Sequence, residues 1–193
     1  KSAMVANTTG DKNVAVGALA LDANTTGVYN TAMGYEALSA NTTTHENTAI
    51  GYNSLKVNVA ASNTGVGTST LYSNTTGTPN TAVGYQALYA NTTGTDNVAV
   101  GYGALDANTT TSYNTAVGKN ALGATVAEGN TGVGREALST NSTGADNTAV
   151  GKGALQSNTT AANNVAVGKN ALFQNTTGAS NVAVGALALD ANT

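Results

Sequence analysis

The chain has 193 residues and a net charge of −3, from seven cationic and ten anionic side chains. This weak charge excludes the electrostatic footprint of a nucleic-acid-binding protein, and no apolar run approaches the roughly 18 residues of a membrane span. Cysteine is absent, which excludes disulfides and thiolate metal sites, and with one Phe and no Trp there is little material for a large globular core.

A phrase of the form Asn-Thr-Ala-Val-Gly recurs along the chain, every seventeen residues except for two intervals of sixteen. A fixed period of this length is typical of a solenoid in which each repeat is one coil. We therefore expect an all-β, parallel β-solenoid (β-roll) of about eleven coils, forming a single repeat domain over residues 1–193 of a longer fibrous chain. The coils start at Asn13, Asn30, Asn47, Asn63, Asn80, Asn97, Asn114, Asn130, Asn147, Asn164 and Asn181.

The first segment of each coil is predicted to be a strand. With the first Asn counted as position 0, positions 0 to 4 alternate, so that positions 1 and 3 share one face and the small residues at 2 and 4 the other. Position 3 is always apolar, and we expect it in the core. Position 4 is always Gly, which permits a positive φ or a close backbone approach at a corner. The corner glycines include Gly17, Gly34, Gly84, Gly101, Gly118 and Gly151.

The second segment, positions 6 to 9, is predicted to be another strand, which carries the Leu of position 8 inward. Stacked coils about 4.8 Å apart would place identical residues above one another in a rod about 50 Å long. The predicted core ladder contains Val16, Leu21, Val83, Leu88, Val100, Leu105, Val150 and Leu155.

The third segment, positions 11 to 14, usually reads Asn-Thr-Thr-Gly and predicts a turn. The Asn of position 0 is predicted to form a ladder with amide-to-amide hydrogen bonds along the stack. This ladder contains Asn13, Asn30, Asn80, Asn97, Asn114 and Asn147. The turns also match the N-glycosylation pattern, as at Asn24, Asn91 and Asn158, although turn geometry explains their regular placement better.

A longer period lies within the short one. The two sixteen-residue coils start 67 residues apart, and each is followed by a coil with Gly in place of Ala at position 2, Gly65 or Gly132. This pattern indicates a duplicated four-coil unit, which suits a shaft whose length matters. The small face at positions 2 and 4 predicts close packing of neighbouring chains, so we expect a homo-oligomer.

The phrase N-[TV]-A-V-G-x-x-A-L, which recurs in every coil with substitutions such as Met33, Ile50 and Gly65, resembles the head repeats of trimeric autotransporter adhesins, although the coils here are longer by an extended turn. It is also similar to repeats of phage tail-fibre-like proteins. The resemblance implies a parallel β-roll with three chains per rod, on a bacterial surface or a virion tail.

Position 5 forms a candidate surface-binding stripe, in which tyrosines give way to cations. A Tyr row could bind a host-surface glycan or protein, and a cation row an anionic polymer. Alternatively, the tyrosines cover a groove and the cations meet carboxylates of neighbouring chains. The stripe contains Tyr35, Tyr52, Tyr85, Tyr102, Lys119, Arg135, Lys152 and Lys169.

Catalysis requires convergent titratable groups, and the sequence offers none: the only His, His45, lies in a turn, and carboxylates occur singly. We expect no enzyme, cofactor or metal site, and no nucleic-acid partner. The predicted function is a structural fibre or adhesin shaft: an extracellular, cell-surface or virion-tail homotrimer, with end-to-end assembly into a filament as a further expectation. The alternative is a monomeric solenoid that binds ice or glycan through a Thr or Tyr row. An ice-binding face would require Thr on one flat strand, whereas Thr clusters in the turns.

Overall fold

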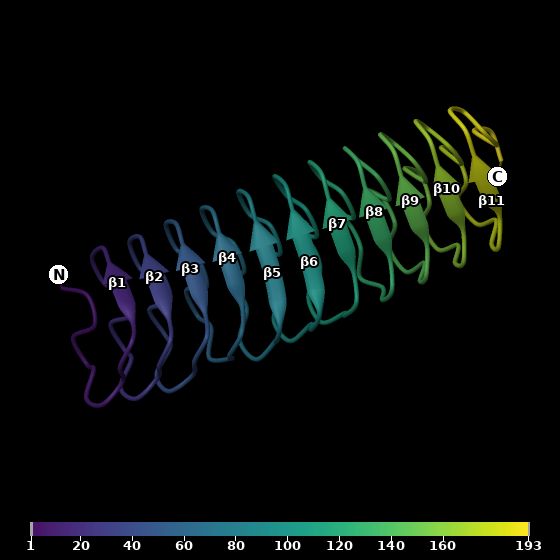
Figure 1. Ribbon diagram of the computed structural model, residues 1–193. Coiled ribbons are helices and arrows are strands. Elements are labelled where there is room, and N and C mark those ends of the chain that lie inside the picture. Colours follow the sequence, from purple (N-terminus) through teal and green to yellow (C-terminus); the bar gives the residue numbers. More distant parts are fainter. Residues whose placement is uncertain (1, 193) are drawn as a thin grey trace.

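The structure, a computed structural model that describes residues 2–192, is a single parallel β-solenoid (Figure 1). Eleven short strands lie side by side in chain order in one sheet, with the two ends of the chain at opposite ends of the rod. This confirms the predicted all-β class and the coil period. The strands are β1 (Val14–Val16), β2 (Thr31–Met33), β3 (Thr48–Ile50), β4 (Thr64–Val66), β5 (Asn80–Val83), β6 (Asn97–Val100), β7 (Thr115–Val117), β8 (Thr131–Val133), β9 (Thr148–Val150), β10 (Val165–Val167) and β11 (Val182–Val184).

The register places equal coil positions opposite one another throughout the sheet. In the β5–β6 pair, for example, Asn80 lies opposite Asn97 and Ala82 opposite Ala99. The two sixteen-residue coils keep this register, since Thr48 still pairs with Thr64. The missing residue is therefore absorbed in a turn, and the sheet continues without a shift.

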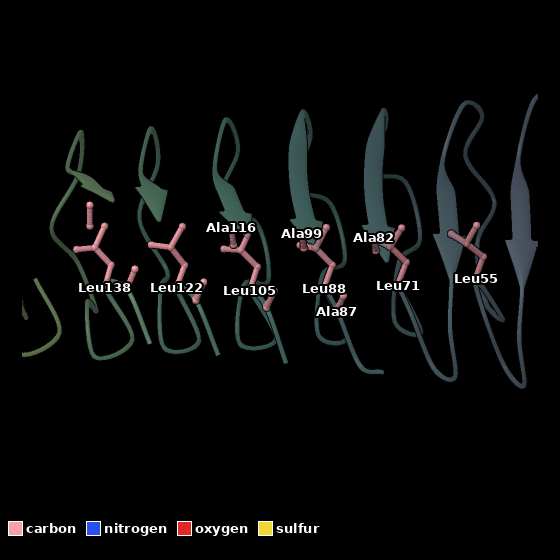
Figure 2. Packing of buried hydrophobic residues seen from close by; sticks show 14 of the residues in the cluster. Leu55, Leu71, Ala82, Ala87, Leu88, Ala99, Leu105, Ala116, Leu122 and Leu138 are labelled. Carbon is pink, nitrogen blue, oxygen red and sulfur yellow. The ribbon is translucent and has the colours of Figure 1, made fainter. Parts of the chain in front are cut away.

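The core consists mainly of Ala at positions 2 and 7 and Leu at position 8, which form columns inside the rod (Figure 2). Position 2 and the leucines lie so close that a Cβ added at Gly132 would be 3.2 Å from Cγ of Leu122 in the preceding coil. A contact of this length is already tight for a methyl group, so the space leaves no room for a branched side chain. The leucines of the predicted ladder, Leu21, Leu88, Leu105 and Leu155, are fully buried as expected.

The valines of the predicted core ladder lie outside the core, which corrects the sequence prediction. Val16 is 54% exposed, Val100 36% and Val150 37%, and Val83 is half-buried. The alternation of the strand was predicted correctly, but the face assigned to the core was wrong. Volume, not hydrophobicity, selects the inner face here, because only the smaller residue fits against leucine.

The predicted second strand does not form, which is a further correction. Positions 6 to 9 are turns in which φ is positive at position 6 and at the leucine of position 8, as for Glu36 (53°) and Leu38 (54°). This alternation points successive N–H groups in opposite directions along the rod. The Glu36 N–H donates to the Ala18 carbonyl of the preceding coil, and the Leu38 N–H donates to the Ser54 carbonyl of the following coil.

The corner glycines have the role that the sequence predicts. Their φ angles lie between +121° and +140°, and a Cβ added at Gly101 would be 2.5 Å from the Gly118 carbonyl oxygen. Both the backbone conformation and the space therefore require Gly. The predicted residues that meet both conditions are Gly17, Gly34, Gly84, Gly101, Gly118 and Gly151.

Two asparagine ladders run along the rod, and they use different hydrogen bonds. At position 0, each side-chain Oδ1 accepts from the backbone N–H of the next Asn in the ladder, as between Asn97 N and Asn80 Oδ1 (3.0 Å). At position 11, the side chains bond amide to amide, as between Asn91 Nδ2 and Asn74 Oδ1 (2.7 Å). The amide-to-amide chain predicted for position 0 is therefore found mainly in the turns. The predicted position-0 ladder is present at Asn13, Asn30, Asn80, Asn97, Asn114 and Asn147.

Candidate functional site

The outer face of the sheet carries two rows of side chains that sequence analysis placed wrongly or missed. One is the apolar row of position 3, which includes Met33 and Ile50 beside the valines and is partly exposed in every coil. The other is the row of position 1, Thr or Val, which lies on the same face of each strand, two residues before the position-3 side chain. The signal was available, since residues 1 and 3 of a strand share a face. The Ala/Gly face was expected to meet neighbouring chains. Its alanines pack instead in the core with the leucines of their own chain, and its position-4 glycines lie against the glycines of the next coil.

The predicted stripe at position 5 does form a column, which runs along the carboxyl ends of the strands, and all eight of its residues are exposed. Tyr35 stacks on Tyr52 with ring centroids 5.7 Å apart, and Tyr85 stacks on Tyr102 at 5.2 Å. Thr68, at the same position, separates the two pairs. Each of these tyrosines therefore turns one ring face toward its stacking partner, and its side chain remains about half exposed.

The cations of the stripe continue the column directly from the second tyrosine pair. Lys119 Nζ lies 5.5 Å from the Tyr102 ring centroid, a cation–π distance. Arg135 forms an exposed ion pair with its neighbour Glu136 at 3.4 Å. Within residues 2–192, Lys152 and Lys169 form no salt bridge. The structure thus joins aromatic and basic halves of the stripe into one line.

A second aromatic–cation row, which sequence analysis missed, lies at position 9. Tyr72 stacks on Tyr89 at 5.3 Å, and Lys56 Nζ lies 5.8 Å from the Tyr72 ring centroid. Lys56 also pairs with Glu36 at 2.6 Å, and this hydrogen bond raises the pKa of Lys56. The Glu36 charge in turn raises the pKa of Tyr35.

Two open hollows, of about 320 and 410 Å³, lie between the rows of positions 6 and 9. Glu36 and Lys56 line the first, and Asp106, Glu136 and Gln156 line the second. Burial raises the pKa of Asp106. Within the described part of the chain, no three His, Cys, Asp or Glu side chains gather as metal ligands would.

The Asn-Thr-Thr turns are closed by their own asparagines. Asn91 is fully buried, and its Nδ2 donates both to the Gly94 carbonyl of its own turn (3.1 Å) and to Asn74 of the preceding coil. Asn24 and Asn158 are equally buried and bond in the same way. An oligosaccharyl group could not reach these amides in the folded rod, so turn geometry accounts for the glycosylation-like pattern.

Comparisons with known proteins add no assignment. No family model, no curated protein and no solved structure matches this chain. Residues 2–192 also contain no helix with the length and apolarity that a membrane crossing needs. The geometry of the exposed rows is therefore the basis on which function is proposed.

Proposed function

We propose that the protein is a non-enzymatic structural shaft, a homotrimer in an extracellular or cell-surface adhesin, a phage tail fibre or a secreted filament. It would serve as a stiff spacer that presents repeated weak contacts, which gain strength by multivalency. The resemblance of the repeat phrase to adhesin heads and tail fibres supports a location on a bacterial surface or a virion tail. Host-surface glycan or protein remains the proposed class of target, and end-to-end joining into filaments a further part of the proposal.

The observation that carries the proposal is the apolar row of position 3. Eleven coils in unbroken register present Val, Met or Ile at the same place on an outer sheet face. A contiguous apolar strip of this length is typical of an interaction surface. A second copy of the chain is the occupant that fits best, because parallel rods with the same coil spacing would match the strip at every level.

Three chains around one axis would bring three such strips together and leave the position-5 stripes beside the interface. Cyclic symmetry closes this assembly without leaving a strip uncovered. The described rod has few buried large side chains besides leucine, so burial between chains would also add to its stability.

The test is the solution mass, measured by light scattering coupled to size exclusion, for the unchanged protein and two variants. Val100→Glu places a charge in the apolar row, and Val126→Glu places the same charge on a turn valine that is similarly exposed. We expect three chains per particle for the unchanged protein and for Val126→Glu, and smaller particles for Val100→Glu. A single-chain mass for the unchanged protein would overturn the proposal.

A second candidate, ice binding by a single chain, gains support from position 1. Threonines such as Thr48, Thr115 and Thr148 stand in register on the outer face of the sheet. The turn threonines are less suited to this role, since Thr92 Oγ1 donates to the Thr109 carbonyl of the next coil. A single-chain mass together with thermal hysteresis that Thr115→Lys abolishes would favour this candidate over the shaft.

A further inference from the structure

We propose that Lys119, Arg135, Lys152 and Lys169, the cation row, form a linear binding site for an acidic polysaccharide that carries a carboxylate or sulfate group on each sugar. The row includes four of the seven cationic side chains of the whole protein. They are the only cations after residue 97, and each stands at the same position of four consecutive coils.

The backbone fixes the spacing of the row. The carbonyl of each row residue accepts a hydrogen bond from the N–H of position 6 in the next coil, at 2.9 or 3.0 Å. The donors are Glu136, Gly153, Asn170 and Leu187. With coils about 4.8 Å apart, the four charges form an evenly spaced row with one cation per coil. A polyanion with one charge per sugar ring has a repeat comparable to this step.

The row is exposed and only partly neutralised by its own chain. Arg135 has a carboxylate partner in Glu136, and Lys119 lies over Tyr102. In the described residues, Lys152 and Lys169 have no acidic partner within salt-bridge distance. Neighbouring cations at this separation repel one another, and a ligand with matching negative charges relieves that repulsion along the whole row.

A nucleic acid fits the surface less well than a polysaccharide does. Single strands are usually held by aromatic rings on which bases stack. The adjacent tyrosines are less available as such a platform, because Tyr85 and Tyr102 stack on one another and Lys119 Nζ lies over the Tyr102 ring.

The experiment measures binding of the unchanged protein to immobilised polygalacturonate, dextran sulfate, neutral dextran and an oligothymidylate. We expect binding to one or both acidic polysaccharides and none to dextran. Raising the ionic strength from about 0.01 M to about 1 M should abolish it, because the Debye length falls from about 30 Å to about 3 Å. Tighter binding to oligothymidylate than to either polysaccharide, or no binding to any polyanion at low salt, would overturn the proposal.

Variants separate the row from net charge. Lys152→Gln should weaken binding by about tenfold, since a multivalent row loses one contact in its middle. Lys12→Gln removes the same charge elsewhere and should leave binding unchanged. Combining Lys152→Gln with Ser180→Lys restores the net charge at the opposite end of a strand, at a position where Lys12 shows that lysine is accepted with positive φ. If this relocated charge restored binding, or if Lys12→Gln weakened it equally, the row would not be the site.

These outcomes are independent of the trimer. Solution mass reports on assembly through the apolar row, whereas polysaccharide binding reports on the cation row. Loss of one with retention of the other would identify which proposal fails.

Discussion

The leucine of position 8 adopts a left-handed conformation in every coil, which is uncommon for a residue with a branched side chain. Leu105, with φ of +52°, is fully buried, and its N–H donates to the Ala121 carbonyl of the next coil at 3.1 Å. The left-handed conformation costs about 1–2 kcal/mol for a residue with a Cβ. Core burial and the inter-coil hydrogen bond offset this cost, so leucine persists where glycine would be easier for the backbone.

This strain reverses the usual order of two substitutions. Leu105→Ala should destabilise the rod by about 2–5 kcal/mol through the cavity that it leaves. Leu105→Gly creates the larger cavity but relieves the strain, so we expect it to be no less stable than the alanine variant. Urea unfolding followed by circular dichroism measures both. A glycine variant clearly less stable than the alanine variant would contradict a left-handed backbone at this position.

Thr125 interrupts the position-11 ladder in the second sixteen-residue coil. Its Oγ1 is buried without a hydrogen-bond partner. In the other sixteen-residue coil, Asn58 donates to the Ala60 carbonyl at 2.7 Å and accepts from Asn74 at 2.7 Å. Thr125→Asn should therefore extend the ladder to Asn141 and stabilise the protein by about 1 kcal/mol.

The control for this prediction is Thr125→Val, which removes the unpaired hydroxyl without adding a ladder bond. Replacing an unsatisfied buried polar atom by a methyl group of similar shape should be neutral or mildly stabilising. Chemical denaturation of the two variants would distinguish these effects. A valine variant that gains as much as the asparagine variant would show that desolvation of the hydroxyl, not the missing ladder, is the weakness.

Asp106 introduces a pH dependence, because burial raises the pKa of its carboxyl above the ordinary 3.8. A raised pKa in the folded state means that folding favours the protonated form. Its contribution to stability is therefore present below the ordinary pKa and is lost as pH rises through the folded pKa. Asp106→Asn should be more stable than the unchanged protein at neutral pH, with the difference shrinking in acid. A difference that does not vary with pH would contradict this assignment.

At the scale of one structural element, the strand that follows each sixteen-residue coil carries Gly at position 2, at Gly65 or Gly132. A Cβ added at Gly65 would lie 2.6 Å from Ser54 Oγ and 2.8 Å from Thr70 Oγ1. These two buried hydroxyls bond each other at 2.8 Å, and Ser54 Oγ also donates to the Gly65 carbonyl. In most coils positions 2 and 7 are both alanine, so at Gly65 the two hydroxyls occupy the space that the methyl group of the strand alanine fills elsewhere.

Because a Cβ at position 65 and the two hydroxyls would occupy the same space, removing the hydroxyls should recover the stability that a Gly65 substitution costs. Gly65→Ala alone should destabilise the protein by about 1–3 kcal/mol through overpacking. Adding Ser54→Ala and Thr70→Ala restores the pattern of the other coils and should recover most of that loss. Melting temperatures of the single, double and triple variants complete the cycle. Strictly additive effects would mean that the three side chains do not share one space.

At the scale of the whole molecule, each strand contacts only the strands of its neighbouring coils. Stability in such a rod is close to a sum of nearest-neighbour terms, so damage should stay local. Gly101 is a suitable place to test this, because a Cβ there would be 2.5 Å from the Gly118 carbonyl oxygen at a φ of +139°.

Gly101→Val should therefore open the junction between β6 and β7. Native-state hydrogen exchange should show faster exchange at these two strands, while β2 and β10 keep their protection. Gly123→Ala is the matched control, since a Cβ there has no heavy atom nearer than 3.4 Å. Loss of protection at all strands in the valine variant would instead mean that the rod unfolds as one unit.

The sequence by itself determined the period, the parallel stacking, the corner glycines and the inward leucine, because each of these follows from residues that repeat in phase. It also placed the position-5 residues in one stripe, since a fixed register puts equal positions in a column. What only the tertiary structure decided was which face of the strand points inward. Alternation separates Val100 from Ala99 but does not rank them, and the narrow gap to the leucines leaves room only for alanine.

The tertiary structure also decided the backbone of positions 6 to 9 and the pairing of asparagines. A strand would point Leu105 inward, and so does a backbone in which φ is positive at every second residue. The sequence pattern does not distinguish the two. The hydrogen bonds to the coils on either side do, because they need N–H groups that point both ways along the rod. The neighbouring coils also fix the hydrogen-bond partner of each asparagine. The inward face of the strand, once decided, leaves the apolar row on the outside of the rod.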